Sequence, residues 1–168
     1  MAFFKKRKRE KPVLVHSIEF NAAGVKDINE DGTNRQDVIQ LIVDDIKGTV
    51  PEDKLFKGIS ENRLMNSSFS MRIYEVEDIP IEIQFEERDV KRHSEIIIHS
   101  QFGIVGKMPQ KIVNEFLECV EKYPERETTA TILGGVTKRV QPDSICGESH
   151  LHTEIQGYKI HVVINFFE

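Results

Sequence analysis

The chain has 168 residues, of which 39% are hydrophobic and 30% are charged, a composition typical of a folded cytosolic protein with one domain. No apolar run approaches the roughly 18 residues needed to span a bilayer, which excludes an integral membrane protein. The opening apolar stretch, Met1 to Phe4, is too short for a secretory signal, and charges follow it instead of preceding it. We therefore expect a cytoplasmic protein.

Charge is distributed unevenly along the chain. Residues 5–11 carry six positive charges and one negative charge, whereas the whole chain carries −5, which leaves −10 for the remainder. This asymmetry predicts a flexible basic arm at residues 1–12 attached to an acidic domain at residues 13–168. Three roles for the arm remain open: a solubilising tail, a contact to nucleic acid, or a touch on anionic lipid aided by Phe3 and Phe4.

The first half of the chain predicts a strand at residues 13–20, a polar loop and then a helix. Thr33 is expected to be the helix N-cap, with Gln36 reaching back to it as in a capping box. Apolar residues recur at helical spacing from Val38 to Ile46, and the pattern ends at Gly48. A short helix is expected at residues 59–65.

The second half predicts a second helix from Pro109 to Tyr123, which ends because a proline follows. The strand at 128–133 is expected to end at Gly134-Gly135, and a polar excursion follows it. Together the elements indicate an α+β fold, an OB-like curved or closed antiparallel β-barrel with two main helices. The expected strands after the first are residues 68–76, 79–85, 95–100, 102–106, 128–133 and 158–166.

Two cysteines do not make a disulfide framework. Cys119 falls among apolar positions of the predicted second helix, which indicates a small core residue in a reducing compartment.

Three groups of short motifs, in this order, carry a family resemblance. The first is Ala23-Gly24-Val25 followed by residues 35–39, where an Arg-Gln pair opens a helix. The second joins the strands at 81–87 and 95–99 to Gly103-Ile104-Val105-Gly106 and a helix. The third is Gly134-Gly135 with Gly157-Tyr158. Over residues 13–167 the chain resembles the HIRAN family, in particular its standalone bacterial or phage members.

The resemblance implies an OB-like barrel that captures single-stranded DNA or a DNA 3′ end in a local pocket, in repair or replication contexts. Such a pocket needs few positive charges, which suits an acidic domain. Arg35, at the start of the first helix, adds a charge where helix amides favour anions. We therefore expect nucleic-acid contacts from Arg35, Gln36, Gly24, Arg92, His93 and Lys107.

Alternatives to this interpretation are weaker. Residues 27–32 match the opening of an EF-hand calcium loop, but Val38 occupies the position of the bidentate glutamate, so a turn rich in Asp and Asn is expected. Cys146, His150 and His152, with His161, lack an established zinc spacing. No catalytic motif is present, so we expect no enzyme, metal or cofactor. The competing hypothesis is a protein-interaction module that has lost nucleic-acid binding, since the Asn-Pro-Tyr-Asp segment common in the family is absent from residues 90–95.

Overall fold

A computed structural model describes residues 11–66, 72–90, 93–142 and 149–168. The arm of residues 1–12 lies almost entirely outside the described residues, as do Arg92 and Cys146. Within these ranges, no helix is long and apolar enough to cross a membrane. The elements, in chain order, are β1 (Leu14–Asn21), α1 (Arg35–Thr49), the 3-10 segment η1 (Glu52–Gly58), α2 (Glu61–Met65), β2 (Arg72–Ile81), β3 (Gln84–Val90), β4 (His93–Ser100), β5 (Gly103–Lys107), α3 (Gln110–Lys122), β6 (Glu125–Pro142) and β7 (Ser149–Phe167).

The strands form two antiparallel sheets, ordered β1-β7-β6-β2 and β3-β4-β5. A single bridge links them: the N–H groups of Ala23 and Lys107 each donate to the other's carbonyl, at 2.8 and 2.9 Å. The predicted α+β class is confirmed. Within the described ranges the two sheets are not closed into a barrel, because one residue pair alone joins β5 to the segment after β1 there.

Helix α1 forms as its apolar periodicity predicts, and its whole apolar face is buried. The predicted cap was wrong by one residue. Asn34 caps the helix, and its side chain accepts a hydrogen bond from the N–H of Gln36 at 2.8 Å. The Thr33 hydroxyl instead donates to Asp31 at 2.6 Å, because the preceding turn already uses it. The buried α1 residues are Val38, Ile39, Ile42, Val43 and Ile46.

Helix α3 is also confirmed, with Pro109 as its N-cap residue and Tyr123 as its C-cap residue. The N–H of Tyr123 still donates to the carbonyl of Cys119 at 2.8 Å, and Pro124 cannot continue this pattern. Cys119 is buried as predicted, and burial raises the pKa of its thiol.

The segment from 79 to 85 was predicted as one strand, and this was wrong. Strand β2 ends at Ile81 and β3 begins at Gln84, so the chain leaves one sheet for the other at this point. The alternating pattern runs through the break because Ile79, Ile81, Ile83 and Phe85 all pack against the same core. The alternating pattern here predicts which side chains are buried, but it does not predict that the chain passes from one sheet to the other.

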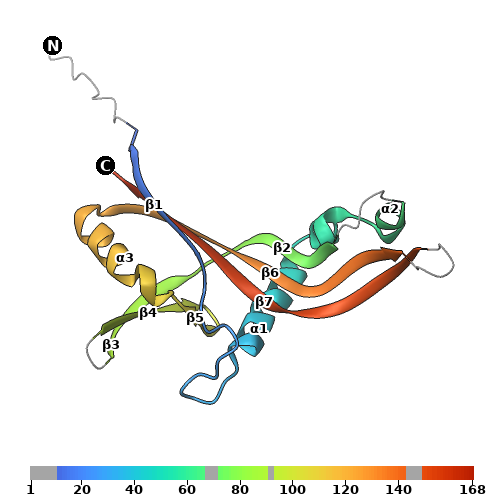
Figure 1. Cartoon of the computed structure of the whole chain (residues 1–168), viewed down its shortest axis with the longest axis horizontal. Coiled ribbons are helices and arrows are strands. Elements are labelled where there is room, and N and C mark those ends of the chain that lie inside the picture. Colours follow the sequence, from blue (N-terminus) through green and yellow to red (C-terminus); the bar gives the residue numbers. More distant parts are fainter. Residues whose placement is uncertain (1–10, 67–71, 91–92, 143–148) are drawn as a thin grey trace, which may run out of the picture.

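A long hairpin of β6 and β7 dominates the shape of the molecule and extends well beyond α1 (Figure 1). Two expectations fail here: β6 does not end at Gly134-Gly135, and most of the polar excursion is strand. The glycines mark a register shift, and a Cβ on Gly134 would lie 2.8 Å from the Tyr158 Cα. The bulge was mistaken for a strand end because glycine is typical of both.

The outer part of this hairpin has a small core of its own. Leu64, Ile73 and Val140 are buried together, so η1 and α2 cover one face of the β2-β6-β7 sheet there. The main core lies between α1, α3 and the two sheets. The described chain therefore has a central body and a projecting three-stranded part. This part consists of the outer portions of β2, β6 and β7, and we call it the hairpin extension.

Candidate nucleic-acid interface

Arg35 lies at the start of α1, and its side chain turns back toward the loop that precedes the helix. Its Nε donates to Asn29 Oδ1 at 2.7 Å and its Nη1 donates to the Gly24 carbonyl at 2.9 Å. Asp27 Oδ2 lies 3.5 Å from the same Nη1. Only 11% of the Arg35 side chain is exposed. These contacts fix the loop of residues 24–34 against the helix.

The backbone amides at the start of α1 are also occupied. The Arg35 N–H donates to the Asp27 carbonyl at 3.1 Å, and the Gln36 N–H donates to the Asn34 side chain. The N–H groups of Asp37 and Val38 donate to the Asn34 carbonyl, at 3.0 and 3.2 Å. The helix start therefore offers none of its first four amides to an external anion, contrary to the expectation from helix geometry alone.

Gln36 connects the same loop to strand β7. Its Nε2 donates to the carbonyls of Val25 at 2.8 Å and Tyr158 at 3.2 Å, and its Oε1 accepts from the Tyr158 N–H at 2.7 Å. The Tyr158 hydroxyl then donates to Gln40 Oε1 at 2.7 Å. A glutamine that holds both segments in this way sets the distance between the loop and the strand.

Directly between that loop and β7 lies a cavity of about 570 Å³, which we call the lysine cavity. It contains the exposed Lys26 and Lys159, and neither ammonium group forms an ion pair with any of the residues that the structure describes. Asp27 is the one carboxylate among its lining residues. The complete lining is Gly24, Val25, Lys26, Asp27, Gln156, Gly157, Tyr158 and Lys159.

Two glycines keep this cavity open. Gly24 has a φ of +64°, and a Cβ on it would lie 2.8 Å from Arg35 Nη1, so both backbone conformation and space require glycine. A Cβ on Gly157 would lie 3.2 Å from Gln36 Oε1 and 3.6 Å from Lys26 Cε. A larger residue at either position would crowd the cavity or its wall.

The structure separates the six predicted residues. Gly24 lines the lysine cavity, while Arg35 and Gln36 hold its walls without lining it. His93 and Lys107 lie elsewhere and both approach Glu95, at 3.9 and 3.3 Å. Arg92 lies outside the described residues. Sequence reasoning missed Lys26 and Lys159, although each lies within two residues of a glycine that it had singled out.

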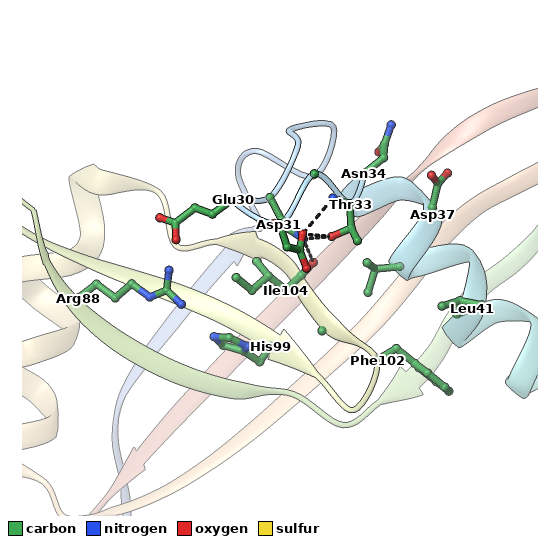
Figure 2. A pocket seen from close by; sticks show the side chains of 14 residues that line it. Glu30, Asp31, Thr33, Asn34, Asp37, Leu41, Arg88, His99, Phe102 and Ile104 are labelled. Carbon is green, nitrogen blue, oxygen red and sulfur yellow. Dashed lines mark hydrogen bonds between the residues drawn. The ribbon is translucent and has the colours of Figure 1, made fainter.

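A second cavity, of about 600 Å³, lies on the other side of the loop and is shown in Figure 2. We call it the acidic cavity, because Glu30, Asp31 and Asp37 line it. Arg88 and His99 line the part formed by β3 and β4. Both side chains already contact a carboxylate, that of Glu86, which lies outside the lining.

The contacts of these carboxylates have clear electrostatic consequences. Arg88 donates twice to Glu86, at 2.8 and 3.0 Å, and His99 Nε2 lies 2.5 Å from Glu86 Oε2. Hydrogen bonds from Arg88, and then from His99, hold the pKa of the Glu86 carboxyl below its usual range. The hydroxyl and N–H of Thr33 likewise lower the pKa of Asp31. The Asp31–Thr33 contacts confirm the predicted turn.

The candidate metal residues do not assemble in the described part of the chain. No group of three or more His, Cys, Asp or Glu side chains there can hold a metal ion. His150 and His152 lie on β7, whereas Cys146 lies outside the described ranges.

Comparisons with protein-family models, with curated proteins and with solved structures return no match for this chain.

Proposed function

We propose that this protein is a non-catalytic nucleic-acid-binding module that captures single-stranded DNA, or a DNA 3′ end, in the lysine cavity. The observation that carries the proposal is the pair Lys26 and Lys159, which border one cavity in an acidic chain. Neither ammonium group forms an ion pair within the part of the chain that the structure describes. Phosphate groups are the anions that such a pair recognises in nucleic acids.

The charges of the cavity suit a strand end better than a duplex. With two lysines and one aspartate, its lining carries a net positive charge, while the chain as a whole carries −5. An acidic protein disfavours the broad phosphate tracking of non-specific duplex binding, but a local pocket needs only a few charges. Gly24 and Gly157 allow the ligand to approach the backbone closely.

The resemblance to the HIRAN family supports the same proposal. It implies capture of a single strand or a 3′ end, and three residues of its first motif, Gly24, Arg35 and Gln36, form or hold the lysine cavity. Arg92, His93 and Lys107 remain predicted contacts for a longer strand. The proposal includes a cytoplasmic location and a role in repair or replication. It also includes an OB-like, curved arrangement of the two sheets.

The acidic cavity favours a second candidate function, binding of a basic peptide by the same scaffold. Leu41 and Phe102 line this cavity and are 52% and 38% exposed, so two apolar side chains lie beside its carboxylates. An apolar floor beside three carboxylates suits a peptide with lysine or arginine residues.

Fluorescence anisotropy with labelled single strands, carrying free or blocked 3′ ends, tests the main proposal. The double variant K26Q/K159Q is expected to bind at least tenfold more weakly, because hydrogen bonds to charged groups contribute about 1.5–3 kcal/mol each. Lys111→Gln is the matched control, since Lys111 is an exposed lysine on α3 outside the cavity. Removal of residues 1–12 should leave the effect of the double variant intact.

Several results would contradict the proposal. The absence of saturable binding at low salt removes nucleic acid as the ligand. Equal affinities of K26Q/K159Q and Lys111→Gln remove the lysine cavity as its site. Binding of a basic peptide together with no binding of single strands favours the second candidate function.

A further inference from the structure

The hairpin extension has a second face, opposite the small core under η1 and α2. Lys138 and Val140 on β6 belong to the covered face, where Lys138 Nζ lies 4.4 Å from the centre of the Phe56 ring. Side chains alternate along a strand, so Thr137 and Arg139 belong to the other face. No element of the small core covers that face, where Thr137 is 1% exposed and the Arg72–Glu154 ion pair joins β2 to β7 across β6.

On this face three cationic or titratable side chains stand in a row across three strands. Arg72 of β2 is the register partner of Arg139 of β6, and Arg139 is the partner of His152 of β7. Directly opposite residues in antiparallel strands have Cβ atoms about 4.5–5.5 Å apart, and like charges in such pairs are destabilising. A pair of opposed arginines therefore calls for an anion.

Among the described residues, one carboxylate, that of Glu154, forms ion pairs with this row. Arg72 Nη2 lies 3.1 Å from Glu154 Oε1. The pKa of Glu154 is lowered, first by a hydrogen bond from Gln156 and then by the charges of Arg72, Arg139 and His152. Its charge balances one arginine and leaves the row with a net positive charge.

Arg139 is the residue left over. Its Nε is buried and has no hydrogen-bond partner, and the side chain forms no ion pair with the residues described. Buried polar groups in proteins almost always have a partner, and a buried guanidinium N–H without one is costly. The planar guanidinium group also matches the geometry of tetrahedral oxyanions with two parallel donors.

We propose that Arg72 and Arg139 form a phosphate-binding site on this second face of the hairpin extension. A phosphate group between the two guanidinium groups would screen their repulsion and accept from their terminal N–H groups. The same chemistry is offered by free inorganic phosphate and by a phosphodiester of a nucleic-acid backbone. The site does not depend on the lysine cavity.

Nitrogen-15 NMR of the arginine Nε–H groups, with inorganic phosphate titrated against chloride at constant ionic strength, tests this site. The Arg139 resonance, identified by its loss in Arg139→Lys, is expected to shift saturably, and Arg72→Gln is expected to abolish the shift. Arg126, an exposed arginine at the other end of β6, is the internal control and should not respond. In a second titration, a single-stranded oligonucleotide is compared with the same sequence on an uncharged methylphosphonate backbone.

The outcomes are distinct. A shift with phosphate supports the site, and a shift with the charged oligonucleotide alone identifies a phosphodiester as its source. No saturable shift in either titration, or an equal shift of the Arg126 resonance, overturns the proposal.

A charge-matched variant separates a guanidinium site from a simple charge effect. Arg139→Lys keeps the charge but loses the paired donors, and binding at Arg72, followed through its own Nε–H, should weaken at least fivefold while Arg126→Lys changes nothing. Unchanged affinity in Arg139→Lys would contradict the site. K26Q/K159Q should retain the phosphate shift at Arg139, so loss of the nucleic-acid proposal and loss of this one remain distinguishable.

Discussion

The two cavities on either side of residues 24–34 differ in charge although one loop borders both. The lysine cavity contains Lys26 and Lys159, whereas the acidic cavity contains Glu30, Asp31 and Asp37. The loop thus presents cationic and anionic side chains in opposite directions. An overall charge of −5 hides this separation, so the net charge of the chain is a poor guide to its ligands.

Both cavities also depend on one anchor. Arg35 ties together Gly24, which lines the lysine cavity, and Asn29, which lines the acidic cavity. A charged residue near a ligand site can therefore act by holding the site in shape. The following predictions test whether the two cavities are separate sites that share this support.

The largest effect is expected from charge reversal in the lysine cavity. The variant K26E/K159E should lower affinity for a single-stranded oligonucleotide by about a hundredfold or more, because two attractive contacts are replaced by repulsion. Anisotropy titrations measure this, with Lys111→Glu as the control for a general change in charge. A loss of less than threefold would place the ligand elsewhere.

Removal of the shared anchor is expected to weaken both cavities at once. Arg35→Met should reduce the free energy of unfolding by about 2–3 kcal/mol, because the acceptors at Gly24 and Asn29 lose a partially buried charged donor. Urea denaturation measures the change, and Arg126→Met, at an exposed position, should have little effect. A variant as stable as the wild type would show that the loop does not need this anchor.

A smaller, selective effect is expected in the acidic cavity. The test ligand is a basic peptide with the sequence of residues 5–11 of this chain, Lys-Lys-Arg-Lys-Arg-Glu-Lys. The variant E30Q/D37N should bind this peptide about tenfold more weakly, since two of the three lining carboxylates are lost. Its affinity for single strands should stay within about twofold of the wild type. Isothermal titration calorimetry distinguishes the two ligands. A parallel loss of both would show that the cavities are not independent.

The smallest effect concerns the Glu86 contacts behind the acidic cavity. Arg88 and His99 lower the pKa of Glu86, so its stabilising contribution is present above the ordinary glutamate pKa and is lost as the pH falls through the lower folded-state value. Thermal unfolding should therefore show a shallower acid-side decline for Glu86→Gln than for the wild type. Identical pH profiles would contradict the assigned cause.

Local patterns in the sequence were sufficient for the helices. The apolar spacing of α1 and α3 follows directly from 3.6 residues per turn, and Pro124 sets the end of α3 through its own geometry. The turn at Asp31 is local for the same reason. In each of these cases the residues that decide the structure are close neighbours in the chain.

Pairing between distant segments could not be predicted in the same way. The run through Gly134 continues as strand because β7 lies beside it, and the change of sheet after Ile81 depends on where β6 and β4 lie. Neither partner strand leaves a signal in the local pattern. The prediction of a closed barrel failed to find support at this same step.

For the candidate sites, the sequence by itself determined residue types and local conformation: the glycine at position 24, the arginine at the helix start and the carboxylates of the turn. Only the tertiary structure decided that Lys26 and Lys159 line one cavity and that Arg72 opposes Arg139. The physical reason is that charges act through space. Partners separated by more than sixty residues in the chain are brought together only by the packing of strands and helices.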